Sequence, residues 1–117
     1  MSRILVVDDD PSIVAVIADI LRAEGHEIVA AENGADALEK ANGESLVLLD
    51  MRMPVLDGWG FARRFRAAGK SSPIVVMTAA ENARRWAEEI GADGYLAKPF
   101  EIDALIAAVE RHAIGGH

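Results

Sequence analysis

Six polar residues follow closely on apolar runs of the sequence, and their side chains are of the types that bind metal ions and phosphate. They are Asp8, Asp9, Asp10, Asp50, Thr78 and Lys98. Carboxylates gathered at one place repel one another, and a hard divalent cation such as Mg²⁺ removes that conflict. A lysine ammonium and a threonine hydroxyl can hold phosphoryl oxygens, and an aspartate can act as the nucleophile. If the fold brings these residues together, their chemistry is phosphoryl transfer.

Five apolar runs predict the strands that would carry these residues. Four are strong and the last is weaker; they cover residues 4–7, 28–31, 46–49, 74–77 and 94–97. The runs are apolar on consecutive residues, without polar alternation. This is typical of strands buried on both faces of a parallel sheet.

Segments with helical spacing of apolar residues separate these runs. Asp10 is expected to cap the first helix, with Pro11 in its first turn and Gly25 after its end. The other helices are expected around residues 35–41, 61–68, 83–90 and 102–109, the last with a stripe of Ile102, Leu105, Ile106 and Val109. Strand and helix alternate five times, which predicts a doubly wound α/β fold with helices on both faces of a five-stranded parallel sheet. The ligand site of such a sheet forms at the carboxyl ends of the strands.

Size and composition restrict the protein class. The chain has 117 residues, a net charge of −7 and no cysteine. Residues 1–113 are expected to form one domain, followed by a short flexible tail at 114–117. The lack of cysteine excludes a disulfide framework and a thiol nucleophile, and the acidic charge argues against direct binding of nucleic acid or anionic membranes. No apolar run could cross a bilayer and no signal-peptide pattern is present, so a cytoplasmic location is expected.

Each of the polar residues also has an ordinary explanation when it is taken alone. An acidic triplet after a strand often forms a solvated turn and helix cap, and Asp50 is as well explained as a turn former. Thr78 could cap the fourth helix, and Lys98 could be a surface lysine. A shared functional role is favoured because all of these residues follow successive predicted strands.

Segments throughout the chain resemble the receiver domain of two-component response regulators, in its single-domain form. The matching segments are 4–10, 46–54, 57–58, 76–79, 91–95 and 98–100, and the resemblance extends from residue 3 to about residue 112. It implies a flavodoxin-like (βα)5 fold. It also implies a signalling switch, not an enzyme, that assists its own phosphorylation and dephosphorylation and has no attached output domain.

The resemblance implies a role for each matching residue. Asp50 would accept phosphate from a histidine kinase or a histidine phosphotransfer protein. Asp8, Asp9, Asp50 and the backbone carbonyl of Arg52 would bind Mg²⁺, with Mn²⁺ as a substitute. Lys98 would bind the phosphoryl group, through a segment in which the Lys98–Pro99 peptide is typically cis.

The resemblance also implies how the signal would leave the site. Thr78 would move toward the phosphate and Tyr95 would turn inward behind it, as a shift between two existing states. This would change the surface of the fourth helix, fifth strand and fifth helix, which binds an unidentified downstream protein. The switch would be a monomer or a phosphorylation-dependent dimer.

Some positions depart from the pattern of the resembled family. The segment at 42–45 is short and has Ser45 where the family more often has Asp, and the stretch from Thr78 to Lys98 is trimmed by a residue or two. Arg52 and Ala80 stand two residues beyond Asp50 and Thr78, where side chains tune the lifetime of the acyl phosphate. The departures affect loop geometry and leave the acidic residues and the lysine in place.

Two other functions are compatible with parts of the pattern. A phosphorylation-independent interaction module on the same fold usually lacks one of the acids or the lysine, and this chain has them all. A Mg²⁺-dependent phosphohydrolase with an aspartyl nucleophile would need a second Asp two residues further on, where this chain has Arg52. Trp86 lies beside two arginines, so it is expected either as an exposed partner anchor or as half-buried packing. Trp59 either reports on phosphorylation or packs at the start of the third helix.

Overall fold

The computed structural model describes residues 2–113, which form five strands and five helices in strict alternation. The strands are β1 (Arg3–Val7), β2 (Glu27–Ala31), β3 (Leu46–Asp50), β4 (Ile74–Ala79) and β5 (Gly94–Lys98). The helices are α1 (Pro11–Ala23), α2 (Gly34–Lys40), α3 (Gly58–Ala67), α4 (Ala80–Ile90) and α5 (Ile102–His112). The predicted elements are all present, with ends that differ by a few residues. The predicted tail at 114–117 lies outside the described residues.

The five strands form one parallel sheet in the order β2-β1-β3-β4-β5. This is the flavodoxin-like order, and it confirms the predicted fold class. Strands β1, β3 and β4 have neighbours on both sides, and the residues of β3 are all buried. Their continuous apolar runs are explained by burial on both faces of the sheet.

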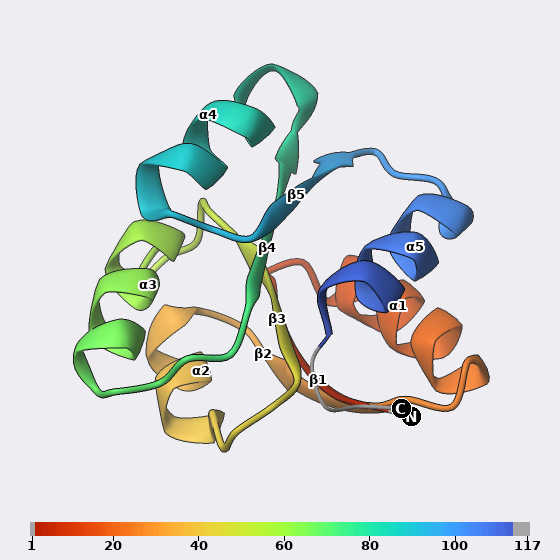
Figure 1. The fold of residues 1–117 in the computed structure, drawn as a ribbon, viewed down its shortest axis with the longest axis horizontal. Helices are drawn as coiled ribbons and strands as arrows, with labels where there is room; N and C mark the ends of the chain where they lie inside the picture. The colour runs from red at the N-terminus through yellow and green to blue at the C-terminus, as the bar shows by residue number, and fades with distance from the viewer. Residues whose placement is uncertain (1, 114–117) are drawn as a thin grey trace.

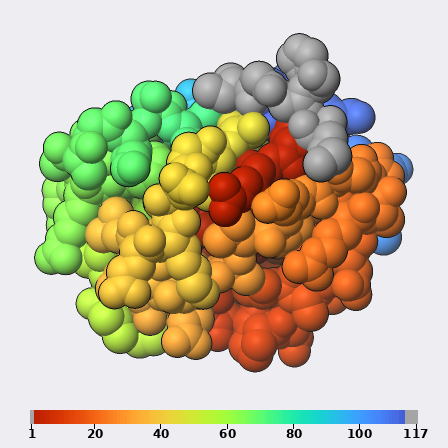
Figure 2. All heavy atoms as spheres, turned by 90° about the horizontal axis from the view of Figure 1, so that it is seen from below, coloured from red at the N-terminus to blue at the C-terminus, as the bar shows by residue number. Residues whose placement is uncertain are grey.

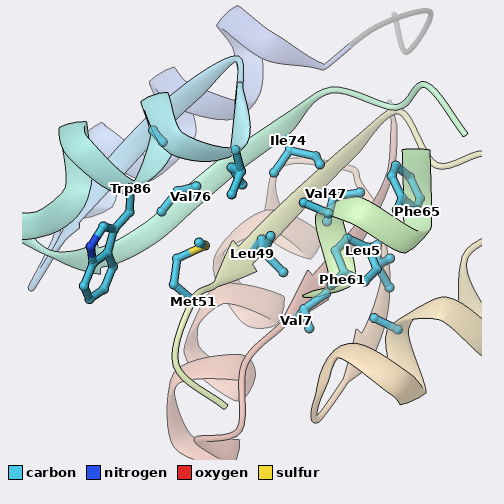
Figure 3. Packing of buried hydrophobic residues seen from close by; sticks show 14 of the residues in the cluster. Leu5, Val7, Val47, Leu49, Met51, Phe61, Phe65, Ile74, Val76 and Trp86 are labelled. Carbon is cyan, nitrogen blue, oxygen red and sulfur yellow. The ribbon is translucent and has the colours of Figure 1, made fainter. Parts of the chain in front are cut away.

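Helices cover both faces of this sheet, as Figure 1 shows: α1 and α5 lie on one side, and α2, α3 and α4 lie on the other. Each layer has its own apolar cluster. One joins alternate strand residues to Ile17 and Leu21 of α1 and to Leu105 and Val109 of α5. The other is larger and includes the residues labelled in Figure 3.

Local signals in the sequence account for most helix ends. The Asp10 side chain caps α1 by accepting a 2.9 Å hydrogen bond from the backbone N–H of Ser12, as predicted. Helix α4 is terminated after Ile90 by Gly91, which is left-handed with φ 62°. Within the predicted apolar stripe of α5, Leu105 and Val109 are buried, whereas Ile102 in the first turn is 58% exposed.

The short segment before β3 is anchored by a buried acid. The Glu44 side chain is 1% exposed and lies 3.9 Å from Nε of Arg3, which is also 3.4 Å from Glu27. Its carboxylate accepts a 2.9 Å hydrogen bond from the N–H of Asn42. Figure 2 shows the red start of the chain between orange and yellow segments, as these contacts require. The shortened loop is thus closed by its own hydrogen bonds.

Within the described range 2–113, no helix has both the length and the apolar character needed to cross a membrane.

Candidate functional site

The sheet brings three acidic residues together at its carboxyl edge. Strands β1 and β3 are direct neighbours, and Val7 is the register partner of Leu49. The residue after each of these is an aspartate, Asp8 just past the end of β1 and Asp50 at the end of β3, so the two lie at the same edge of the sheet. With Asp9 they form a cluster in which one carboxylate oxygen of each residue lies within 4.8 Å of the others. The predicted convergence of these residues is confirmed.

Lys98 reaches this acidic cluster from the edge of the sheet. It is the last residue of β5, and its Nζ lies 2.7 Å from Oδ2 of Asp8 and 3.6 Å from Oδ1 of Asp50. The following Lys98–Pro99 peptide bond is cis, in agreement with the sequence-based expectation. Lys98 is thus an ion-pair partner of the cluster and not a free surface lysine.

The charges of this pocket are poorly solvated. The side chain of Asp8 is 1% exposed and that of Asp50 is 11% exposed, whereas Asp9 is exposed. Burial raises the pKa of Asp50 to about 6, and the charges of Asp8 and Asp9 act in the same direction while Lys98 opposes them. Metal-free Asp50 therefore carries an energetic cost when it ionises.

Thr78 and Tyr95 occupy different environments. Thr78 is buried near the end of β4, one residue beyond Met77, which is the register partner of Asp50. The N-cap position of α4 is Ala79, so Thr78 does not cap that helix. Tyr95 is on edge strand β5 and is 50% exposed.

In the loop after Asp50, the side chain of Arg52 lies against helix α4. Cζ of Arg52 lies 5.0 Å from the ring centroid of Trp86 in α4. Trp86 is only 5% exposed, so of its two expected roles the exposed partner anchor is excluded, and its packing is more complete than the half-buried alternative. Its helix face of Ala83, Ala87 and Ile90 is buried with it. Trp59 packs in α3, with its ring against that of Trp86.

Close approach of α3 to this loop explains why residue 58 is a glycine. A Cβ on Gly58 would lie 2.8 Å from Cα of Met51 and 2.9 Å from the carbonyl oxygen of Asp50. These are backbone atoms that cannot move aside without displacing the end of β3. The sequence showed an Asp57-Gly58 pair, and Asp57 caps α3, but no local pattern indicated this contact.

Val55 holds the same loop in a strained turn. Its φ is 70°, and the N–H of Leu56 donates a 2.8 Å hydrogen bond to the carbonyl of Pro54, which closes a three-residue turn around it. Positive φ is unfavourable for a β-branched residue. Strained backbone of this kind is often found beside functional sites.

Replacement of this valine by glycine is expected to stabilise the protein. Relief of the strain outweighs the extra chain entropy of glycine, so Val55→Gly should raise the free energy of unfolding by about 1 kcal/mol. Urea denaturation measures the change. Val16→Gly is the matched control, since Val16 is exposed within α1, and it should lower stability by a similar amount. Destabilisation by Val55→Gly would show that the turn is unstrained.

The donor set of the pocket fits a hard divalent cation. Three carboxylates within reach of one another supply oxygen ligands, which such ions prefer. The buried negative charge at Asp8 and Asp50 gives the cation a further advantage, because it neutralises acids that water barely reaches. The acidic triad could therefore hold a metal ion.

Comparison with known proteins agrees with this geometry. Residues 4–110 match the response regulator receiver domain. The chain is 40% identical to the transcriptional regulatory protein PrrA of Mycobacterium tuberculosis over 112 residues, which cover 92% of this chain and 48% of PrrA. It is 36% identical to the alkaline phosphatase synthesis transcriptional regulatory protein PhoP of Bacillus subtilis, and the match covers 95% of this chain and 49% of PhoP. The chain spans about half the length of these curated relatives.

Solved structures of similar length give the same result. Chemotaxis protein CheY4 of Vibrio cholerae superposes with a TM-score of 0.86 at 30% identity, covering 96% of this chain and 98% of that one. A two-component response regulator from Clostridium difficile gives 0.85 at 29% identity, with 95% and 94% covered. The chain therefore belongs to the response regulator receiver domain family of two-component signalling.

Proposed function

We propose that this receiver domain is a signalling switch that accepts a phosphoryl group on Asp50 with the help of bound Mg²⁺. The observation that supports this most directly is the cluster of Asp8, Asp9 and Asp50, with Lys98 Nζ 3.6 Å from Asp50. Mn²⁺ is a chemically reasonable substitute, since both ions take oxygen ligands. The backbone carbonyl of Arg52 is the proposed fourth protein ligand.

The contacts within the pocket favour Asp50 as the acceptor over its neighbours. Asp8 is engaged by Lys98 at 2.7 Å and by the N–H of Asp10 at 2.9 Å, and Asp9 is exposed at the rim. Asp50 is further from Lys98, at 3.6 Å, and its carboxylate also accepts a hydrogen bond from the backbone of Met51. In the proposed step an Asp50 oxygen attacks the phosphorus of a phosphohistidine, and the bond to the imidazole nitrogen breaks. The cation and Lys98 offset the charge on the phosphoryl oxygens.

The output of the switch is proposed to run through Thr78 and Tyr95. Thr78 is buried beside the strand end that carries Asp50, which supports a role in sensing the phosphate. Tyr95 is half exposed in the state described here, so an inward rotation would alter the surface formed by α4, β5 and α5. Phosphorylation would thus shift a population between two states of this surface.

The proposed partners follow from the same chemistry. A histidine kinase or a histidine phosphotransfer protein supplies the phosphoryl group, and a downstream protein binds the α4-β5-α5 surface. The named relatives are transcriptional regulators about twice as long. With a net charge of −7, this segment itself is not expected to bind nucleic acid. We also propose that the protein is cytoplasmic. It is proposed to be a monomer, or a dimer that forms only on phosphorylation.

A mass measurement tests the acceptor directly. Incubation with Mg²⁺ and acetyl phosphate should add one phosphoryl group to the intact protein. The adduct should be absent in Asp50→Asn and after addition of EDTA, while Asp36→Asn, an acid of the α2 surface ion pair, should behave as wild type. Mn²⁺ should restore the adduct after chelation of Mg²⁺.

The other candidate functions predict different results. An unmodified wild-type protein would favour a phosphorylation-independent interaction module. Sustained release of phosphate from many substrates would favour a phosphohydrolase, which would lack its general acid here because Arg52 stands two residues after Asp50 and its guanidinium is directed to Trp86.

A further inference from the structure

A series of side-chain contacts leads from the loop after Asp50 to the surface between α3 and α4. Cζ of Arg52 lies 5.0 Å from the ring centroid of Trp86. The ring of Trp86 meets that of Trp59 edge-on, with 5.0 Å between centroids. The indole nitrogen of Trp59 donates a 2.9 Å hydrogen bond to Oε1 of Glu89. These contacts join the loop to α4 and α4 to α3.

The middle of this series is firmly held. Trp86 is 5% exposed and belongs to the same apolar cluster as Met51, the residue between Asp50 and Arg52. Figure 3 shows Trp86 at the end of the cluster that also holds Met51 and Val76. Closely packed side chains transmit displacements, because there are few voids to absorb them. A movement of the loop backbone would therefore be passed to the Trp86 ring.

We propose that Arg52 is a positioning residue for the metal site, acting through its contact with Trp86. The inference rests on the proposed function, in which the backbone carbonyl of Arg52 is a ligand of the cation. The side chain and the carbonyl belong to the same residue, so stacking of the guanidinium on Trp86 restricts the rotation of the loop backbone. It holds the carbonyl where the cation needs it and lowers the entropy cost of binding.

The coupling must also operate in the reverse direction. If the Arg52–Trp86 contact favours cation binding, then the bound cation strengthens that contact by the same factor. Binding of the cation in the pocket would thereby alter the surroundings of Trp86 and Trp59, where α4 contacts α3. The connection from the Asp50 pocket to these two tryptophans runs through loop 51–57 and does not involve Thr78 or Tyr95.

Titration with Mg²⁺ alone tests the proposal in the full chain. We expect Arg52→Met to weaken the affinity measured by calorimetry by about three- to tenfold, as the loss of a cation–π contact implies. It should also reduce the change in tryptophan fluorescence that Mg²⁺ causes. Arg52→Lys retains a cation and should recover most of both. Arg85→Met, which removes an arginine of α4 that bonds to Asn82, should match the wild type.

A second substitution separates the contact from general effects on the loop. Trp86→Phe keeps an aromatic ring in the core but presents a weaker face to the guanidinium. If the two residues act as a pair, Arg52→Met should weaken Mg²⁺ binding less in the Trp86→Phe background than in wild type. Equal effects in both backgrounds would contradict a pairwise contact.

The outcomes distinguish this inference from the proposed function. Wild-type Mg²⁺ affinity and fluorescence response in Arg52→Met would overturn the inference alone, because the phosphoryl adduct tests the acceptor separately. If Arg52→Met lost Mg²⁺ affinity and Arg52→Lys did not recover it, the inference would also be overturned, because the positive charge of the side chain would then not be the cause. A wild-type protein that binds no Mg²⁺ would overturn both.

Discussion

Asp50→Asn is expected to stabilise the metal-free protein at neutral pH, although it removes the proposed acceptor. Burial and the neighbouring acids raise the pKa of Asp50 to about 6 from an ordinary value of 3.8. Between these two values the unfolded state loses its proton more readily than the folded state, so stability falls as the pH rises. The full cost is present above pH 6 and amounts to roughly 3 kcal/mol at most. The asparagine variant does not carry this cost.

Denaturation in EDTA at several pH values measures this effect. The stability difference between Asp50→Asn and wild type should be largest above about pH 6 and should disappear below about pH 4. Millimolar Mg²⁺ should reduce the difference, because the cation stabilises the wild-type folded state. Asp36→Asn is the matched control, since its surface pair with Lys40 lowers the pKa of Asp36 and its removal should cost stability. A constant difference across the pH range would contradict an ionisation effect.

Lys98→Met is expected to have the largest effect of opposite sign. The ammonium lies 2.7 Å from Asp8, whose side chain is 1% exposed, and the substitution leaves this buried charge without its partner. Breaking a buried pair in this way costs about 3–5 kcal/mol. The free energy of unfolding in EDTA, obtained from urea denaturation near pH 7, should fall by an amount of this order.

Mg²⁺ and a surface lysine provide the controls for this variant. The cation can take over part of the neutralising role, so Mg²⁺ should stabilise Lys98→Met more than it stabilises wild type. Lys40→Met makes the same substitution at a surface lysine whose Nζ lies 3.0 Å from Oδ2 of Asp36. It should lower the free energy of unfolding by less than about 1 kcal/mol. Similar losses in both variants would mean that the contact between Lys98 and Asp8 is no stronger than a surface pair.

Much of the pocket could be predicted from the sequence, because strand ends are visible in it. Consecutive apolar residues indicate buried parallel strands, and parallel strands place their carboxyl ends at one edge. Asp8, Asp50 and Lys98 were located in this way, and the structure brings them within contact of one another. No knowledge of side-chain conformation was needed for that inference.

Features that depend on packing in three dimensions could not be predicted. Helical spacing shows which residues share a face but not how far the neighbouring layers extend. It therefore did not indicate that Ile102 is exposed or that Trp86, expected to be exposed or half-buried, is buried. The direction of the Arg52 side chain, the positive φ of Val55 and the close approach at Gly58 have no local signature. Each depends on how the loop after Asp50 packs against α3 and α4.

The position of Lys98 links the electrostatics of the pocket to the rigidity of the sheet. It contacts Asp8 although β5 is an edge strand and two strands, β4 and β3, lie between β5 and β1. An edge strand has a neighbour on one side only, so its local opening costs less than that of a central strand. Opening of β5 would withdraw the ammonium from the acids. A cation that took its place would free β5 to move, and by linkage a protein that held β5 in place would change the affinity of the pocket for that cation.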